Sequence, residues 1–478
     1  MRLSSIALCV FALTPAALGC AAQPRPEAGP AEGAPGEARA ALGADEARAR
    51  AALGADEARA RAALMATAAS ACLPTNQACV VSKLRRTPLR DDIVEYSFEL
   101  KVGPGEFDRI GLHRVARETA PYRPAAAATG VFLVHGDVWP FNPMFVGGPP
   151  KAPAPRAESA AIYFAERGID VWGIDRRWVQ SPAATTDFTF MRDWTLDVQL
   201  QDLGVGLGVA RALRALTGSG AGPVHLLGFS RGAALTYAYA NAEAQVPPAL
   251  RQIKGLVPVD YAYKFDPADA VNGASACQLY RDSVALFEQG GLSGYALQIY
   301  ADIGALAATD PRGASPFVPA LTNENFAVAI FTREPGDPGP FTPFFHNFGA
   351  RRVLGPDFET LYTDEAEYFD VLQSVAAVES FREEVDTSAI SCDEVDTPYD
   401  DHLGAITVPT FYVGAKGGFG DTALYTLGLL GSADKSSLFV GELPAGEELL
   451  DWGHQDLFTA AGATELVFRP IADWLLAH

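Results

Sequence analysis

Positive charge is scarce in this sequence. Its 478 residues include 37 lysines and arginines against 58 aspartates and glutamates, which gives a formal net charge of −21. A surface of this charge repels the phosphates of nucleic acids and the headgroups of anionic lipids. We therefore expect neither nucleic acid nor an anionic membrane surface as an electrostatic partner.

The acidic residues are partly concentrated between residues 379 and 401, where nine carboxylates accompany a single arginine, Arg382. A charge run of this kind usually lies in a solvated loop, and we predict one here. The alternative is a calcium site, because calcium prefers carboxylate oxygens as ligands. The candidate ligands for that alternative are Asp393, Glu394, Asp396, Asp400 and Asp401.

The N-terminal apolar run lacks the length that a membrane span requires. Residues 3–13 are apolar and follow a basic residue, and small residues come shortly after them. This layout is typical of a bacterial export signal that is removed from the mature protein. We therefore predict a signal peptide at residues 1–19 and an exported protein.

Cys20 directly follows Gly19, which resembles a lipobox, where the cysteine is lipidated and becomes the mature N-terminus. The pattern departs from the usual one at Ala17, where leucine is typical, and at Leu18, where a small residue is typical. We expect a lipoprotein of the periplasm, the outer membrane or the cell surface, with this lipid as its sole membrane anchor. The alternative is a secreted protein that is cleaved after Gly19.

Cysteine is rare as well, with six in the whole sequence. Setting aside Cys9 in the signal and Cys20 at the lipidation site leaves Cys72, Cys79, Cys277 and Cys392. Four cysteines in an exported protein suggest two disulfides. Three pairings are possible, and proximity in the sequence favours Cys72–Cys79, which leaves Cys277–Cys392.

Residues 20–71 contain almost nothing that a core could bury. Residues 41–51 are repeated as residues 52–62, and the period of eleven is close to three helical turns. One leucine in each repeat forms only a thin stripe along such a helix. We predict a semi-rigid spacer, with a coiled-coil partner as the alternative.

The folded domain is predicted to span residues 72–478. Two antiparallel strands come first, and apolar strands then alternate with helices, which indicates a mostly parallel sheet that is covered on both faces. The alternation stops between about residues 261 and 403, in aromatic- and proline-rich sequence, and we predict an inserted cap there. The strands are expected at 93–102, 109–116, 131–134, 170–174, 224–227, 255–259 and 407–413, and the helices at 156–167, 194–216, 233–244 and 463–477.

The strongest functional signal follows the strand at residues 224–227, where the chain reads Gly228-Phe229-Ser230-Arg231-Gly232. Gly-x-Ser-x-Gly between a strand and a helix is typical of a nucleophile elbow, a sharp turn that exposes the serine hydroxyl. A Cβ at Gly228 or Gly232 is expected to collide with the neighbouring strand or helix. We predict Ser230 as a nucleophile.

A serine hydroxyl needs a base that takes its proton. The elbow arrangement orders its triad as serine, acid and histidine, so the base should follow Ser230 in the sequence. His454 fits best, because Gly453 lets its loop bend over the sheet just before the last helix. His402 is the alternative, and His346 is the remaining downstream candidate inside the chain.

The acid of the triad should follow a strand. Residues 407–413 run into a glycine-rich loop that ends at Asp421, whose carboxylate would accept the second N–H of His454 and fix its tautomer. Asp260 directly follows the strand at residues 255–259 and is the alternative. Asp434 is a more distant candidate, and we predict Asp421.

An oxyanion needs two backbone donors. One should be the N–H of Arg231, directly after the serine. The other should come from the turn after residues 131–134, where His135-Gly136 leads to Asp137. We predict the N–H of Asp137 as the second donor, with its carboxylate turned away and with His135 as a structural residue of the loop.

In this order and spacing, the motifs give residues 93–478 a resemblance to the α/β-hydrolases. Residues 168–177 and 452–456 resemble two segments of acid lipases, although Arg176-Arg177 stands where those enzymes have Arg-Gly. The resemblance implies a serine hydrolase of the carboxylic ester class that acts through an acyl-enzyme, without a metal or cofactor. The cap would be inserted between the sixth and seventh strands of the family's sheet.

We expect a small apolar ester as the substrate and a monomeric enzyme. Aromatic residues of the insertion would favour an apolar group, or would equally form the core of the cap itself: Phe326, Phe331, Phe341, Phe344, Phe345 and Phe348. The same triad also serves thioesterases, acyltransferases and peptidases. A non-catalytic, surface-tethered binding module is the alternative from a different class.

Overall fold

The computed structural model describes residues 38–72, 79–148, 156–294, 297–332, 345–352, 357–448 and 450–478. The chain divides into two compact units, Met1–Ala62 and Ala63–His478. The predicted signal, Cys20, Phe341 and Phe344 lie outside the described residues. Within those residues, no helix has the length and apolar character needed to cross a membrane.

The eleven-residue repeats form part of helix α1 (Ala38–Cys72). Leu53 is 69% exposed, as expected for a stripe too thin to form a core. Leu64 and Ala68 are buried instead, and they belong to a hydrophobic cluster of the second unit. The folded unit therefore begins at Ala63, ahead of the predicted boundary at Cys72.

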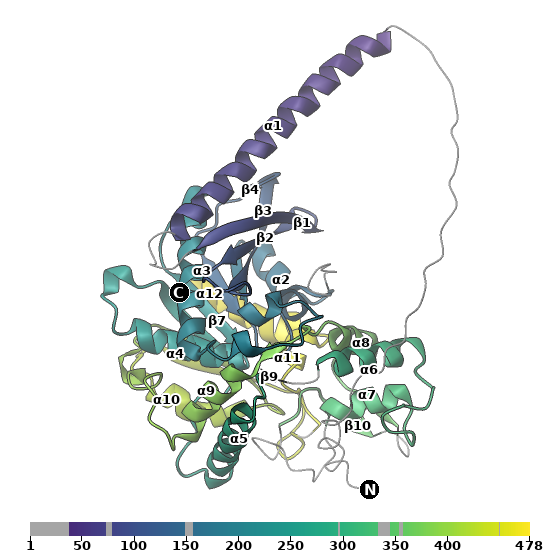
Figure 1. Cartoon of the computed structure of the whole chain (residues 1–478), viewed down its shortest axis with the longest axis vertical. Coiled ribbons are helices and arrows are strands. Elements are labelled where there is room, and N and C mark those ends of the chain that lie inside the picture. Colours follow the sequence, from purple (N-terminus) through teal and green to yellow (C-terminus); the bar gives the residue numbers. More distant parts are fainter. Residues whose placement is uncertain are drawn as a thin grey trace. The chain divides into compact units, whose positions relative to one another are not determined.

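One sheet of ten strands organises the second unit, in the order β1-β2-β3-β6-β5-β7-β8-β13-β14, with β4 paired to β3 (Figure 1). Strands β1 to β3 are antiparallel, β3 joins both β4 and β6 antiparallel, and the remaining neighbours are parallel. The mostly parallel sheet and the antiparallel pair at its start match the prediction, whereas β1 was not predicted. The bounds are β1 (Val80–Arg90), β2 (Ile93–Lys101), β3 (Arg109–Ala120), β4 (Arg123–Pro124), β5 (Gly130–Val134), β6 (Asp170–Asp175), β7 (Val224–Phe229), β8 (Ile253–Val259), β13 (Thr410–Ala415) and β14 (Lys435–Val440).

The central strands β5, β6 and β7 are buried at every position because both faces of the sheet are covered. In β5, Val131 and Leu133 belong to one hydrophobic cluster, and Phe132 and Val134 belong to another. This assignment follows the alternation of side chains along a strand. The helices associated with the sheet are α2 (Ala160–Glu166), α3 (Leu196–Leu216), α4 (Arg231–Glu243), α10 (Leu424–Leu429), α11 (Asp456–Thr459) and α12 (Arg469–Ala477).

The chain leaves the sheet after β8 and returns to it in β13, which pairs directly with β8. The intervening insertion is mainly helical and follows the predicted limits of the cap. It contains α5 (Ala270–Glu288), α6 (Leu297–Thr309), α7 (Asn323–Phe331), α8 (Glu365–Gln373) and α9 (Phe381–Cys392), and the short strands β9 (Ser293–Gly294), β10 (Ala350–Arg352), β11 (Phe358–Thr360) and β12 (Glu379–Ser380).

The acidic stretch is not a solvated loop over its first half. Residues 379–392 form β12 and α9, and Glu379, Glu383 and Glu384 are buried. The prediction failed because Glu383 and Glu384 have arginine partners far away in the sequence, which a local charge pattern does not reveal.

The second half of the stretch carries the carboxylates of the calcium alternative. Lys264 Nζ pairs with both Asp393 and Asp400. Arg281 Nη1 lies 2.9 Å from Glu394 Oε1. Protein cations therefore already neutralise three of the five candidate calcium ligands.

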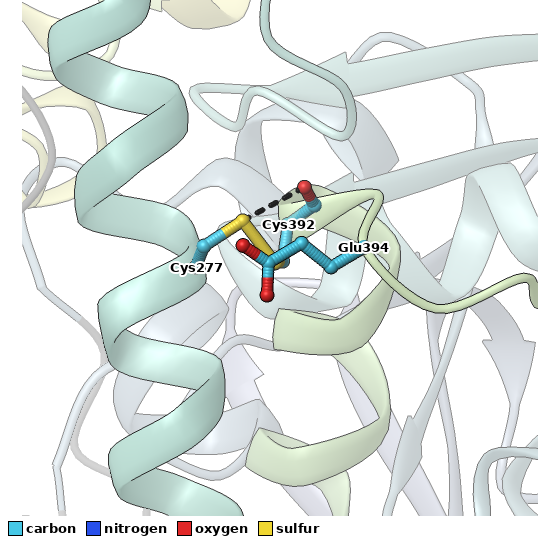
Figure 2. A group of neighbouring side chains, drawn as sticks. All are labelled: Cys277, Cys392 and Glu394. Carbon is cyan, nitrogen blue, oxygen red and sulfur yellow. Dashed lines mark hydrogen bonds between the residues drawn. A yellow bond between two sulfur atoms is a disulfide. The ribbon is translucent and has the colours of Figure 1, made fainter.

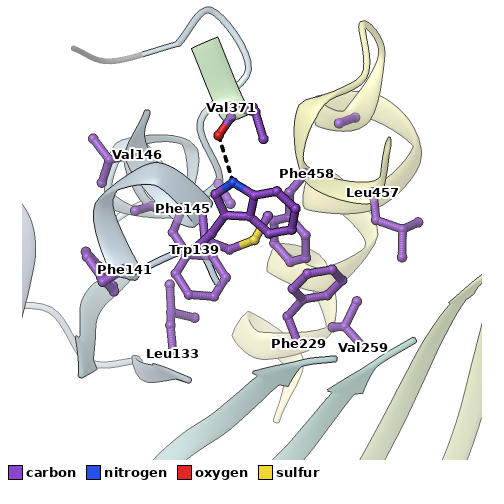
Figure 3. Packing of buried hydrophobic residues seen from close by; sticks show 14 of the residues in the cluster. Leu133, Trp139, Phe141, Phe145, Val146, Phe229, Val259, Val371, Leu457 and Phe458 are labelled. Carbon is purple, nitrogen blue, oxygen red and sulfur yellow. Dashed lines mark hydrogen bonds between the residues drawn. The ribbon is translucent and has the colours of Figure 1, made fainter. Parts of the chain in front are cut away.

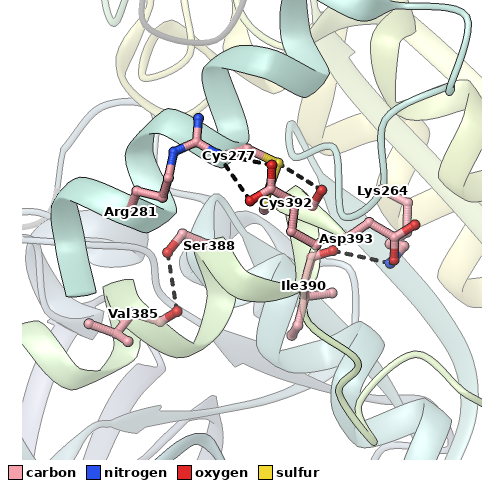
Figure 4. The surroundings of a disulfide bond; sticks show 9 residues. Lys264, Cys277, Arg281, Val385, Ser388, Ile390, Cys392 and Asp393 are labelled. Atoms are coloured by element: carbon pink, nitrogen blue, oxygen red, sulfur yellow. Dashed lines mark hydrogen bonds and ion pairs between the residues drawn. A yellow bond between two sulfur atoms is a disulfide. The ribbon is translucent and has the colours of Figure 1, made fainter. Parts of the chain in front are cut away.

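Cys277 of α5 and Cys392 of α9 form a disulfide, which confirms the predicted pairing (Figure 4). Glu394 lies beside the two sulfurs (Figure 2), but thiols joined in a disulfide are not available as thiolate ligands for a metal. Cys79 is disulfide-bonded too, whereas the side chain of its predicted partner Cys72 lies outside the described residues.

The Cys277–Cys392 bridge closes a long loop, since its cysteines are 115 residues apart. Loop-closure entropy predicts that the double variant Cys277→Ala/Cys392→Ala loses about 5 kcal/mol of unfolding free energy. Urea denaturation of both proteins without reductant measures this loss and leaves the bridge of Cys79 intact. Equal unfolding free energies would contradict the prediction.

Candidate active site

Ser230 sits at the turn between β7 and α4, as the sequence predicts. Its backbone has φ 56° and ψ −131°, and its N–H donates to Val259 O at 3.0 Å. A Cβ on Gly228 would overlap the carbonyl oxygen of Gly232, and a Cβ on Gly232 would overlap that of Val134. The two glycines thus allow the strand and helix to close tightly enough to strain the serine.

His454 lies next to this turn, in the loop between β14 and α11. Its ring stacks on Phe229, with the centroids 4.5 Å apart, and its Nδ1–H donates to Asp260 Oδ2 at 2.7 Å. Both members of this pair are buried. A carboxylate at Nδ1 fixes the tautomer that leaves Nε2 as a proton acceptor.

The prediction that Asp421 holds His454 is wrong, and the alternative acid, Asp260, occupies that position. Asp421 lies in a turn, Gly420–Ala423, with an exposed side chain. The glycine-rich loop after β13 does not carry the acid toward His454; it wraps around the acid that follows β8. Asp434, the third candidate, instead pairs with His478 at 3.2 Å.

The loop after β13 supplies backbone donors to Asp260. Oδ1 accepts the N–H groups of Ala415 at 2.9 Å, Phe419 at 3.1 Å and Gly420 at 3.3 Å. A Cβ on Gly418 would overlap Asp260 Oδ2. A fully buried carboxylate therefore has hydrogen bonds on both oxygens, which burial requires.

The segment after α7 supports the histidine loop. The carbonyl of His346 accepts the N–H of His454 at 2.9 Å, and that of Asn347 accepts the N–H of Gln455 at 2.7 Å. The ring of His346 pairs with the carbonyl of Glu448. His346 thus holds the loop of His454, a role that no local sequence pattern indicates.

His402, the alternative base, belongs to a different environment. Its backbone N–H donates to Asn241 Oδ1 at 2.7 Å, just before a short 3-10 turn, Leu403–Ala405. His454 is the histidine that pairs with a buried carboxylate beside Ser230, so the geometry favours it as the base.

The two residues predicted to supply oxyanion donors are joined through their side chains. Arg231 Nε donates to Asp137 Oδ1 at 2.5 Å, and Nη2 donates to Oδ2 at 2.8 Å. Gly136 brings this turn against Ser230, because a Cβ there would lie 2.7 Å from Ser230 Cβ. A bidentate pair fixes both distance and orientation, so it holds the turn after β5 against the start of α4.

Helix α9 completes this charged cluster from the insertion. Glu384 and Thr387 Oγ1 both accept from Arg231, and Glu383 accepts from Arg176. Arg176 also donates to the carbonyl of Gly136. Arg176, the first residue of the Arg176-Arg177 pair, therefore holds the predicted oxyanion turn in place.

Burial and ion pairs set the charges within the cluster. Burial raises the pKa of Asp137, but the charges of Arg231 and Arg176 outweigh it and leave that pKa below its ordinary value. Burial, aided by repulsion from Asp137, raises the pKa of Glu379 well above its ordinary value. Burial also raises the pKa of Glu383 to about 7, against the lowering effect of Arg176.

His135 is neutral and structural. Its Nδ1–H donates to Gly136 O at 2.8 Å, and its Nε2 accepts the N–H of Arg176 at 3.3 Å. Burial, together with the charge of Arg176, lowers its pKa to about 3. Both nitrogens are thus occupied in the neutral form.

The turn continues into Trp139, which is anchored by the insertion. Trp139 Nε1 donates to the carbonyl of Val371 in α8 at 2.7 Å, among the aromatic rings shown in Figure 3. Ala376 N–H donates to the carbonyl of Val138 at 2.8 Å. Val138 itself has a positive φ of 54°, so the insertion secures a strained part of the turn.

These groups surround one cavity of about 330 Å³. Ser230, His454, Asp137 and Arg231 all line it. Helices α5, α6, α7 and α9 contribute further walls, so the insertion forms part of the site. Of its predicted aromatics, Phe331 and Phe345 line the cavity, whereas Phe326 and Phe348 are buried in the hydrophobic core.

The sequence itself matches no protein-family model and no curated protein. The structure, however, is similar to that of a proposed lipase from Sulfolobus solfataricus, with a TM-score of 0.56 and 17% identity over 83% of this chain and 98% of the other. The chain has the α/β-hydrolase fold.

Two further solved structures align with lower scores. A thermophilic esterase from Thermogutta terrifontis gives a TM-score of 0.38, with 14% identity over 83% of this chain and 99% of the other. A monoglyceride lipase from Saccharomyces cerevisiae gives 0.40, with 13% identity over 83% of this chain and 95% of the other. Within this fold, Asp260 follows β8 and His454 follows β14.

Gly418 offers a test of the carboxylate-binding loop. Gly418→Ala should lower the unfolding free energy by about 2 kcal/mol, because its Cβ overlaps Asp260 Oδ2 and the buried loop must shift. Urea denaturation measures this change.

The matched control is Gly428→Ala, in the exposed part of α10. No atom of the described residues lies within 4 Å of a Cβ at that position. This variant should gain roughly 0.5–1 kcal/mol, because alanine is the better helix former. A loss at Gly428 equal to that at Gly418 would show that the Asp260 contact is not the cause.

Proposed function

We propose that this chain is an exported serine hydrolase that cleaves carboxylic esters through an acyl-enzyme intermediate. One observation carries the proposal: His454, which pairs with the buried Asp260, lines the same cavity as Ser230, whose backbone is held in the left-handed region. A histidine oriented by a carboxylate is the group that converts a weak serine hydroxyl into a nucleophile.

In the first half of the reaction, His454 Nε2 takes the proton of Ser230 as Oγ attacks the ester carbonyl. Asp260 stabilises the imidazolium that forms, while its backbone donors hold the carboxylate in place. The carbonyl oxygen becomes an oxyanion, and we assign its donors to the backbone N–H groups of Arg231 and Asp137. The side-chain pair between these residues sets the distance between the two donors.

Collapse of the tetrahedral intermediate breaks the ester bond. His454 gives its proton to the departing alcohol, and the acyl group stays on Ser230 as an ester. A water molecule, deprotonated by His454, then attacks this acyl-enzyme and releases the carboxylic acid. Asp260 acts as a positioning residue throughout, since it touches His454 and not the reacting carbonyl.

The cavity walls support a lipophilic ester. Trp139, Tyr300, Phe331, Phe345 and Phe419 line it. Rings of this kind favour an apolar acyl chain. Thioesters, amides and acyl transfer use the same catalytic groups, so a panel of thioester, amide and p-nitrophenyl ester substrates separates these alternatives.

Export rests on the N-terminal sequence. Residues 1–19 have the layout of a signal peptide, and Cys20 is the proposed lipidation site of a surface-tethered monomer. The disulfide between Cys277 and Cys392 is compatible with an oxidising compartment. Mass spectrometry of the mature N-terminus distinguishes a lipidated Cys20 from simple cleavage after Gly19.

A fluorophosphonate probe tests the nucleophile. The wild type should become covalently labelled, and Ser230→Ala should lose all labelling while keeping its melting temperature within a few degrees. Ser283→Ala, at a buried serine of α5, is the control that should still label. A wild type that does not react would favour the non-catalytic binding module.

The acid is tested by a matched pair of variants. Asp260→Asn should lower kcat about 10⁴-fold, because the amide favours the wrong tautomer of His454. Asp421→Asn should retain nearly full activity, because Asp421 is exposed and lies away from the Asp260–His454 pair. Steady-state hydrolysis of p-nitrophenyl butyrate measures both. A comparable loss in Asp421→Asn would return the acid to the loop after β13.

A further inference from the structure

The cavity beside Ser230 has a second, polar wall opposite in character to its aromatic lining. Helix α9 contributes Glu384, Ser388 and Ser391, which are spaced i, i+4 and i+7 and so share one face of the helix. Gln455, the residue after His454, also lines the cavity. An ester whose acyl and alcohol groups are both hydrocarbon would leave these polar side chains without hydrogen-bond partners.

The polar groups of this wall present mainly acceptors. Ser388 Oγ donates to the carbonyl of Val385 at 3.1 Å (Figure 4), and Ser391 Oγ donates to that of Tyr263 at 3.3 Å. Each hydroxyl hydrogen is therefore used, and each oxygen keeps lone pairs to accept with. The wall is thus complementary to a molecule that donates hydrogen bonds.

Gln455 adds an independent observation. The residue is 3% exposed, and its Oε1 has no hydrogen-bond partner among the described residues. Buried acceptors are rarely left in this state, because the loss of hydration is not repaid. A donor on a bound substrate would satisfy it.

The charged residues around the cavity restrict which kind of hydrogen-bond donor the substrate can carry. Arg231 lines the same wall, so a substrate ammonium would be repelled by a guanidinium. Glu384 and Asp137, which pair with Arg231, disfavour an anionic substrate. Neutral hydroxyl groups are the donors that fit both constraints.

We propose that the substrate is a partial ester of a polyol. Free hydroxyl groups of its alcohol portion donate to Ser388, Ser391 and Gln455, and its acyl chain lies against the aromatic wall. Gln455 lines the same cavity as His454, which protonates the leaving alcohol, so we assign this acceptor to the alcohol portion. This inference rests on the proposed ester hydrolase function.

Two soluble esters test the inference: glycerol 1-monobutyrate and propyl butyrate. They share the acyl group and a three-carbon alcohol, and they differ only in two free hydroxyls. The wild type should hydrolyse the glycerol ester with a kcat/KM about tenfold higher or more, since each net hydrogen bond is worth roughly fivefold. The double variant Ser388→Ala/Ser391→Ala should lower that preference at least fivefold.

Ser283→Ala is the control, because it makes the same change at a buried serine of the insertion that does not line the cavity, and it should keep the full preference. Equal kcat/KM for the two esters in the wild type, or a preference for propyl butyrate, would overturn the polyol assignment even if the double variant did not fold. Failure to cleave either ester, combined with absent fluorophosphonate labelling, would instead overturn the ester hydrolase function.

Discussion

The buried carboxylate of Asp260 is the constraint on which the rest of the site depends. A charge removed from water must be matched by hydrogen bonds on both of its oxygens. Here the match comes from His454 and from three backbone N–H groups of the loop after β13. The order β7-β8-β13 brings the serine turn, the acid and this loop to the same edge of the sheet. Without the loop, Asp260 would be an unpaired charge, and His454 would lose its orientation.

The insertion contacts both the loop of His454 and the turn after β5. Its residues 345–347 hold the histidine loop through backbone hydrogen bonds, and α8 and α9 hold the oxyanion turn through Trp139 and Arg231. The bridge from Cys277 to Cys392 ties α9 to α5, and both of these helices line the cavity. A rigid-body movement of the whole insertion would therefore break contacts both to the loop of His454 and to the turn after β5.

Local sequence patterns were enough for Ser230 and His454 but not for their acid. The strand–turn–helix around the serine and the glycine before the histidine are short-range features. Asp260 and Asp421 both follow strands, so their positions in the sequence do not show which of them pairs with His454. The glycine-rich loop itself distinguishes the two acids. Glycine is needed at position 418 because the carboxylate of Asp260 approaches the backbone there, whereas a carboxylate that projects outward, such as that of Asp421, does not require it. The burial of the α9 acids could not be predicted from the local sequence, because their partners, Arg176 and Arg231, lie far earlier in the chain.

The same reasoning explains how four acids can surround a site that must stabilise negative charge. Asp137 and Glu384 are paired with Arg231, and Glu383 is paired with Arg176. Glu379 makes no ion pair with either arginine among the described residues, and burial together with the charge of Asp137 raises its pKa well above its ordinary value. A raised pKa favours the neutral carboxyl, and the pKa of Glu383, which burial raises to about 7, lets this residue bind a proton near neutral pH. In the proposed reaction, an oxyanion that forms at the backbone of Arg231 would therefore meet local dipoles and a nearby guanidinium, although the protein as a whole carries a net charge of −21.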